Sequence, residues 1–440
     1  MSATALLCAL PVLAQPKQTL PLLAPWSGPH GGFPPLDKVK VEDFQPALEA
    51  AMALQRHEIA AICDNPAAPA FVNTVVALER SGRAFERVAN LYYLWSGSLS
   101  TAAFQAVERE MEPRLAAYRD EIAQNGKLFK RIAAVYVSPE MARLTAEQQR
   151  LVWVYHTRFV KHGARLDAAQ QQRVAEINQR LASLQTLFSQ NLLAEEQEQA
   201  LVLTDAADLA GLSRAEIDGA AAEAERRGQA GHWVFANTRS AIEPFLAGSS
   251  RRDLRERAWR IWTFRGDNGD AHDNNRIVTD ILTLRAERSR LLGFPSYAHW
   301  KLSDSMARDP QAALDLMTKV WQPATAALRR DVAEMQKLVD AEGGGFAIEP
   351  WDYRYYAGKL RKASHDLALE EVTPYLQLDR VREAMFMAAG RLYGLRFVQL
   401  ADVPVFHPDA TIYEVRGADG RRIGLWYFDP YAREGKNSGA

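Results

Sequence analysis

One apolar stripe constrains the fold of this chain more than any other feature. Five apolar residues recur at alternating spacings of three and four: Val174, Ile177, Leu181, Leu184 and Phe188. This spacing places them on one face of a long helix. Asp167 precedes the stripe and is a preferred N-cap residue. We therefore expect a long, one-sidedly buried helix that begins near Asp167.

Other segments also carry helix signals. An Ala-rich amphipathic stretch runs from Phe44 to Ile62 and is stopped by Asp64-Asn65-Pro66. A second helix is expected around Ile281 to Leu292, where Gly293 ends it. The chain is therefore predicted to be mainly α-helical.

Period-two alternation is scarce until late in the chain. There Thr411–Val415 and Ile423–Phe428 flank Gly417–Gly420, whose residue types favour a tight turn. We expect a small late β-hairpin. Both faces of Ile423–Phe428 are apolar, so this strand is expected to promote self-association if one face and one edge stay uncovered.

Size and charge limit the class of protein. A chain of 440 residues exceeds what one hydrophobic core usually holds, so two or more lobes are expected. A mean hydropathy of -0.26 argues against a polytopic membrane protein, and we expect no membrane span. Lys and Arg number 53 against 54 Asp and Glu, so no global positive field favours nucleic acid as a partner.

The first residues resemble a secretory signal peptide. An apolar run from Ala5 to Ala14 ends in small residues, although no Lys or Arg precedes it. Residues 1–14 are therefore expected to direct the protein to the periplasm or outside the cell, with a cytoplasmic location as the alternative. Removal of this segment would leave Cys63 as the only thiol, so no intrachain disulfide is expected.

No motif in this chain predicts a metal site. None of the nine His residues has a His partner four or five positions away. His57-Glu58 begins like a zincin motif, but Ala61 stands where the second His is required, so His57 is interpreted as a solvated helix residue. The loop Asp267–Asp273 has no Gly at the sixth position and no Glu at the twelfth position of a calcium loop, and it is interpreted as a solvated turn.

The aromatic run Trp351–Tyr356 leaves two interpretations open. Its Tyr side chains offer contact area with a polar tip, suited to a peptide-binding groove. Packing between lobes is the equal alternative. Two other aromatic pairs have helical spacing and are expected in the core: Tyr155 with Phe159, and Trp259 with Trp262.

Eight segments, taken in order, resemble one family. They are Phe71–Gly82, Phe188–Leu193, Leu291–Ala298, Met306-Ala307, Pro350–Asp352 with Tyr355-Tyr356, Leu392–Leu395, His407–Asp409 and Phe428–Arg433. Together they resemble the zinc oligopeptidases, which include thimet oligopeptidase, oligopeptidase A and bacterial dipeptidyl carboxypeptidase, most closely the last. The likeness extends from about Leu20 to Ala440.

This resemblance implies a two-lobed helical zincin-type scaffold with a deep channel for short unstructured peptides. It implies zinc held by H-E-x-x-H and a later Glu, in a segment beyond the one that matches Gly435–Ala440. We therefore expect a scaffold truncated before the zinc helix, with no catalytic residue, no metal ligand and no bound zinc in this chain. Candidate substrate-channel residues are Tyr355 and Tyr356 from the aromatic run and Trp426 from the last strand.

The predicted function is that of a zinc metallopeptidase that releases C-terminal dipeptides from short peptides, present here as a fragment. The alternatives are a truncated peptide-binding or interaction module and a degenerate pseudoenzyme. The parent enzyme is expected to be a monomer, and the fragment is expected to self-associate. The expected divisions are residues 1–14 (signal peptide), 15–37 (Pro/Gly-rich arm), 38–235 (helical region) and 236–440 (first part of the peptidase region).

Overall fold

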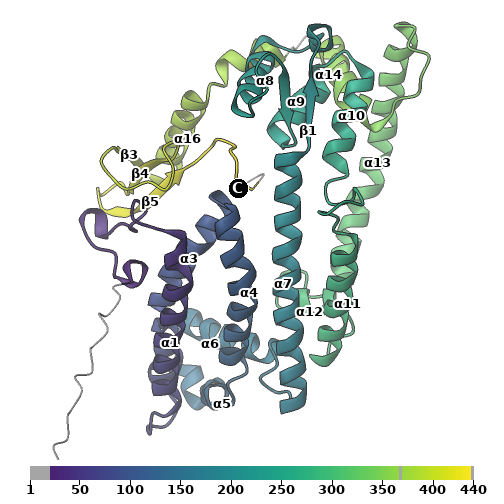
Figure 1. The fold of residues 1–440 in the computed structure, drawn as a ribbon. Helices are drawn as coiled ribbons and strands as arrows, with labels where there is room; N and C mark the ends of the chain where they lie inside the picture. The colour runs from purple at the N-terminus through teal and green to yellow at the C-terminus, as the bar shows by residue number, and fades with distance from the viewer. Residues whose placement is uncertain (1–19, 366–368, 438–440) are drawn as a thin grey trace, which may run out of the picture.

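Two groups of helices stand side by side in the computed structural model, which describes residues 20–365 and 369–437 (Figure 1). The first lobe contains α1 (Phe44–Cys63), α2 (Ala77–Arg80), α3 (Arg83–Ser98), α4 (Ala102–Ala123), α5 (Gly126–Tyr136) and α6 (Ala146–Lys161). The second lobe contains α7 (Ala168–Glu198), α8 (Arg214–Arg226), α9 (Arg239–Gly248), α10 (Arg252–Thr263), α11 (Asn275–Leu291), α12 (Tyr297–Leu302), α13 (Pro310–Ala341) and α14 (Pro350–His365). The prediction of a mainly helical scaffold is confirmed.

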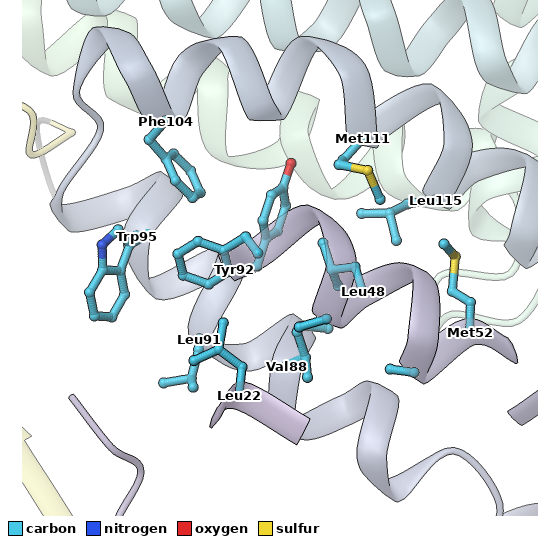
Figure 2. Close-up of a cluster of buried hydrophobic side chains, with 14 of the residues drawn as sticks. Leu22, Leu48, Met52, Val88, Leu91, Tyr92, Trp95, Phe104, Met111 and Leu115 are labelled. Atoms are coloured by element: carbon cyan, nitrogen blue, oxygen red, sulfur yellow. The ribbon is translucent and has the colours of Figure 1, made fainter. Parts of the chain in front are cut away.

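The core of the first lobe lies between α1, α3 and α4 (Figure 2). Three aromatic residues in this core are fully buried: Phe44, Tyr92 and Phe104. Their ring centroids lie 5.3 to 6.0 Å apart. Thr101 caps α4 by accepting a hydrogen bond from the Phe104 amide, which is the usual role of Thr at this position. The N-terminus of α4 is therefore fixed both by its cap and by a buried aromatic ring.

The predicted long helix is α7, which begins where the sequence indicated. Asp167 accepts a hydrogen bond from the Gln170 amide and forms a capping box. Val174, Ile177, Leu181 and Leu184 are at most 3% exposed, and the last three pack with α11. The stripe thus explains why α7 is buried along one face.

Polar side chains of α7 contact α4 and so join the two lobes. The Asn178 amide donates to both carboxylate oxygens of Asp120 on α4, at 2.8 and 3.0 Å. Farther along, the Gln190 amide donates to the Glu108 carboxylate at 3.2 Å. The interface between the lobes is therefore polar and partly ionisable.

Asp120 gives this interface a testable pH dependence. Burial raises its pKa to about 6, although the hydrogen bonds from Asn178 oppose the shift. The folded chain thus holds the Asp120 proton more tightly than the unfolded chain does, so its contribution to stability is lost as the pH rises through the folded pKa. Asp120→Asn removes this titration, and the variant should gain unfolding free energy relative to the natural chain between about pH 4 and pH 7. Urea unfolding across that range measures the difference, and a pH-independent difference would contradict the expectation.

Two small antiparallel sheets complete the fold. The predicted hairpin is confirmed as β4 (Thr411–Arg416) and β5 (Arg422–Phe428), with Tyr413 opposite Trp426. Three strands were not predicted: β3 (Arg396–Leu400), which pairs with β4, and β1 (Ala200–Leu203) with β2 (Trp233–Ala236). β1 and β2 have only four residues each, too few for a clear alternation.

The three-stranded sheet and two further helices, α15 (Leu369–Val372) and α16 (Leu378–Tyr393), follow the second lobe in sequence. In Figure 1 the sheet and α16 nevertheless lie above the first lobe, beside α3. The expected boundary between residues 235 and 236 falls inside β2.

Residues 20–37 of the predicted arm contain two short 3-10 turns, Pro21–Leu23 and Pro29–Gly31, and no α-helix. Leu22 is buried in the core of the first lobe, and His30 forms an ion pair with Glu414 of β4. The hydrogen bonds from His30 and Arg416 hold the pKa of Glu414 below its ordinary value. The predicted signal peptide, residues 1–14, lies outside the described residues. Within the part of the chain that is described, no helix is both long and apolar enough to cross a bilayer.

Strand β5 leads to a prediction about association. It pairs with β4 on one edge, and no strand in the described part of the chain pairs with its other edge. Ile423 is 58% exposed. Because an open, apolar edge can accept another strand, we expect the 440-residue chain to self-associate and a chain ending at Val398 to do so less. Light scattering on both chains measures this, and a monodisperse 440-residue monomer would contradict it.

Candidate functional site

A long groove follows α8, α9 and α14 in the second lobe and the segment 430–437. It consists of two adjoining cavities, of about 1530 and 960 Å³. Both cavities share wall residues from these elements: Ala215, Glu216, Thr238, Ser240, Pro244, Ala432, Arg433 and Lys436. We call the two together the interlobe groove, because the segment 430–437 is attached to the first lobe.

The segment 429–437 is stabilised by ion pairs between its own residues. Arg433 makes a bidentate ion pair with Asp429, at 2.7 and 2.9 Å, and the Lys436 ammonium lies 3.2 Å from the same carboxylate. Burial works against ionisation of Asp429, but the hydrogen bonds from Arg433 and Lys436 prevail and hold its pKa below the ordinary value. The segment is therefore a compact ionic loop.

Backbone contacts tie this loop to the end of α3. The Ser100 amide donates to the Gly435 carbonyl at 2.8 Å, and the Asn437 amide donates to the Gly97 carbonyl at 2.9 Å. Gly435 has a φ of +75°, and a Cβ there would lie 3.0 Å from the Ser100 carbonyl oxygen. A glycine is required at this contact, because other residues rarely adopt this conformation.

A buried ion cluster sets the position of α14 on the other wall. Asp352 is 0% exposed and accepts hydrogen bonds from Arg252 at 2.9 Å and Arg255 at 2.8 Å, both on α10. The Arg255 guanidinium also lies 4.2 Å from the centre of the Tyr355 ring. Asp352 thus links two helices, and Arg255 links that cluster to a residue of the groove wall.

The charges around Tyr355 give the groove its electrostatic character. The larger cavity is lined by basic residues, namely Arg239, Arg354, Lys359, Arg361, Lys362, Arg433 and Lys436, and by the acidic residues Glu216 and Glu243. Arg354 donates to Glu243 at 2.7 Å, and Lys359 donates to Glu342 at 2.7 Å. The larger cavity of the groove therefore carries an excess of positive charge, which attracts anionic groups.

The three predicted channel residues lie in different surroundings. Tyr355 lines the groove. Tyr356 is 5% exposed and packs with Met335 and Val339 of α13. Trp426 belongs to the sheet, where its ring lies 5.6 Å from Phe386 and 5.1 Å from Phe428. The structure thus brings only Tyr355 to the groove, and substrate contacts of Tyr356 and Trp426 stay predictions.

The aromatic run packs within the second lobe rather than between the lobes, and its peptide-binding interpretation stays a prediction. Trp351 packs against Trp259 at 5.6 Å, and Tyr356 is in a buried cluster, so these two residues pack helices together. The other predicted aromatic pairs also contact hydrophobic cores. Sequence reasoning missed the basic residues of the groove, although Arg354 lies inside the aromatic run and Arg433 ends the segment Phe428–Arg433.

The described residues offer no fit for a zinc ion. Among residues 20–365 and 369–437, no group of three His, Cys, Asp or Glu side chains could hold a metal. His57 is exposed on α1, as predicted. Asp273 accepts hydrogen bonds from the Gly269 and Asn275 amides, which hold its pKa below the ordinary value. The loop Asp267–Asp273 is thus a solvated turn, as interpreted from the sequence.

Comparison with known proteins gives a family match and several relatives. Residues 245–440 match the family model described as peptidase family M3. The dipeptidyl carboxypeptidase of Escherichia coli (strain K12) is 36% identical over 425 residues, which are 96% of this chain and 61% of that protein. Oligopeptidase A of Salmonella typhimurium is 29% identical over 430 residues, which are 96% of this chain and 62% of that protein. The chain thus spans about three fifths of the length of these curated relatives, and the resemblance seen in the sequence is confirmed.

Proposed function

We propose, from the peptidase family M3 domain that residues 245–440 carry, that the protein is a zinc metallopeptidase of short peptides. In this proposal it releases dipeptides from the C-terminus, as the name of its 36% identical relative suggests. The observation that carries the proposal is the basic larger cavity of the interlobe groove, which Tyr355 lines. A peptide bound there places its free C-terminal carboxylate in a positive field.

The groove residues have separate binding roles in this proposal. Tyr355 supplies a flat aromatic surface and a hydroxyl for the peptide backbone. Lys359 supplies positive charge; burial opposes its protonation, but its bond to Glu342 raises its pKa, so it stays charged at neutral pH. Arg354 stands next to Tyr355 on α14 and adds a second cation. These residues bind and orient a peptide.

The zinc ion implied by the family has no ligands among the residues described, so no catalytic step is assigned to them. Zinc would supply a polarised water for peptide hydrolysis. The proposal therefore gives this chain the substrate-binding part of the peptidase.

Metal analysis tests the division between binding and catalysis. Because no described group of side chains has ligand geometry, we expect the dialysed 440-residue chain to hold less than stoichiometric zinc and to leave short peptides uncleaved. Elemental analysis and chromatography of a heptapeptide digest measure both. One tightly held zinc per chain, or release of dipeptides, would contradict this expectation.

Peptide binding tests the groove itself. A fluorescent heptapeptide with a free C-terminus should bind the 440-residue chain, and its C-terminal amide should bind more weakly. Lys359→Gln should weaken binding about tenfold, equivalent to about 1.4 kcal/mol. Lys337→Gln is the matched control, because Lys337 also pairs with a Glu but lies on α13 outside the groove. Equal binding by the acid and the amide, or by the two variants, would overturn the proposed role of the groove.

Two other expectations remain proposals. If peptides bind this groove tightly without being cleaved in any zinc-loaded form of the protein, the alternative of a peptide-binding module is favoured.

Export to the periplasm is tested by cell fractionation with and without residues 1–14, and retention of both forms in the cytoplasm would favour the cytoplasmic alternative.

A further inference from the structure

One long helix of the second lobe carries an apolar stripe that is only partly covered. The helix is α13, and Figure 1 shows it at the outer edge of that lobe. Its stripe residues recur at spacings of three and four: Leu314, Met317, Trp321, Ala324, Leu328, Val332, Met335 and Val339. This spacing places all of them on one face of the helix. The stripe therefore extends along most of α13.

The two ends of the stripe differ in burial. Met335 and Val339 are buried, because they pack with α14. Toward the N-terminus of the helix, Met317 is 60% exposed, Trp321 is 69% exposed and Leu328 is 45% exposed. A contiguous apolar surface of this kind marks a site of interaction. The same stripe is thus a helix–helix interface at one end and an unpartnered surface at the other.

The exposed part of α13 is amphipathic. Asp315, Lys319 and Gln322 lie on the face opposite the stripe. The positions that flank the stripe on either side are uncharged: Thr318, Val320, Thr325 and Ala327. Charged residues at flanking positions decide which helices can pair. Charge repulsion therefore does not prevent two copies of this stripe from packing against each other.

The stripe is also complementary to itself when it is reversed. Trp321 and Ala324 lie at equal distances from the midpoint between residues 322 and 323, and so do Met317 and Leu328. In two antiparallel helices related by a two-fold axis at that midpoint, Trp321 of each copy faces Ala324 of the other. A large side chain opposite a small one fills a layer without overpacking it. Met317 faces Leu328 in the adjoining layers.

The exposed area is sufficient for a dimer interface. Five large side chains are exposed on the stripe and its flank: Leu314, Met317, Val320, Trp321 and Leu328. At about 200 Å² for a large side chain, of which roughly half to two-thirds is exposed, they present about 600 Å² per chain. Two copies together would bury about 1,200 Å², the lower limit of a stable specific interface. The area therefore suits a dimer that forms at micromolar concentration.

We propose that the exposed stripe of α13 binds the same stripe of a second copy of this chain, with the two helices antiparallel. The interface is isologous, because each copy contributes the same residues. It lies on a different surface from the interlobe groove and does not depend on peptide binding. It also differs from association through the open edge of β5, which needs no contact of α13.

Sedimentation equilibrium of the 440-residue chain tests this proposal. At tens of micromolar chain we expect a species with twice the 49.2 kDa mass of one chain. Trp321→Glu should weaken dimerisation at least tenfold, because it places a charge in the centre of the interface. Met306→Glu is the matched control, since Met306 is 99% exposed and precedes α13. A natural chain that stays monomeric, or equal effects of the two substitutions, would overturn the proposal.

Exchange of the two central residues tests the antiparallel register. Trp321→Ala leaves two small residues in each central layer, and Ala324→Trp crowds two indole rings into it, so each variant should weaken dimerisation at least tenfold. The double variant, Trp321→Ala with Ala324→Trp, restores one large and one small residue per layer and should dimerise within about threefold of the natural chain. Failure of this rescue, with an unchanged helical circular dichroism spectrum, would overturn the proposal.

A substitution in β5 separates this dimer from association through the sheet. Ile423 is exposed on β5, and Ile423→Glu places a charge beside the open edge of that strand. The two-chain species should persist in this variant with its dissociation constant unchanged. Loss of the dimer in Ile423→Glu, together with its retention in Trp321→Glu, would place the contact at β5 and overturn the proposal.

Discussion

Asp352→Ala is expected to lower the free energy of unfolding by about 3–5 kcal/mol, the usual cost of removing one partner from a buried ion pair. Asp352 is 0% exposed, and Arg255 beside it has a side chain that is 2% exposed. The substitution leaves a buried guanidinium without its carboxylate. It also removes the link between α10 and α14, so the Tyr355 wall of the groove loses its support.

Urea unfolding followed by Trp fluorescence measures this cost. Asp253→Ala is the matched control, because Asp253 also pairs with an arginine, Arg251, but its side chain is 62% exposed. An exposed pair contributes under about 1 kcal/mol, so the control should change stability little. A similar small loss in both variants would contradict the role assigned to Asp352. Heptapeptide binding by Asp352→Ala should also weaken, because α14 carries Tyr355 and Lys359.

Phe104→Ala is the second substitution with a large expected effect. Phe104 is 0% exposed, and its ring centroid lies 5.3 Å from those of both Phe44 and Tyr92. Figure 2 shows Phe104 beside Tyr92 in this core. Truncating a buried Phe to Ala removes its burial and leaves a cavity, at a cost of about 3–5 kcal/mol. Phe104 follows the Thr101 cap, so the start of α4 and the neighbouring Ser100 contact with Gly435 should loosen as well.

The comparison variant is Phe104→Leu, which keeps much of the volume and should cost less than about 1.5 kcal/mol. Urea unfolding of both variants gives the two values. A loss below about 1 kcal/mol for Phe104→Ala would show that the core between α1, α3 and α4 collapses around the gap. Hydrogen exchange of the amides in α4 would then show whether its first turn has been lost.

Local sequence patterns predicted several elements correctly. The stripe from Val174 to Leu184 identified α7 and its buried face, and Asp167 identified its first turn. The Gly417–Gly420 turn identified the hairpin of β4 and β5. These features are local, because a helix cap, a helical face and a tight turn each depend on residues within a few positions of one another.

The interlobe groove was not predictable in the same way. Its walls come from α8 and α9, from α14 and from residues 430–437, which are far apart in sequence. Asp352 meets Arg252 and Arg255 about 100 residues earlier in the chain. The charged residues of these segments look like ordinary surface residues in the sequence, because nothing local indicates which of them will face one another.

The sequence by itself indicated the helical class, the long helix α7, the late hairpin and the resemblance to peptidase family M3. Only the tertiary structure decided that Tyr355 lines a basic cavity while Tyr356 is buried. The physical reason is that periodicity specifies which face of a helix is buried, but not which distant element covers it. The partner of each face is set by how the helices of the two lobes pack, and that packing brings the charges of both lobes together.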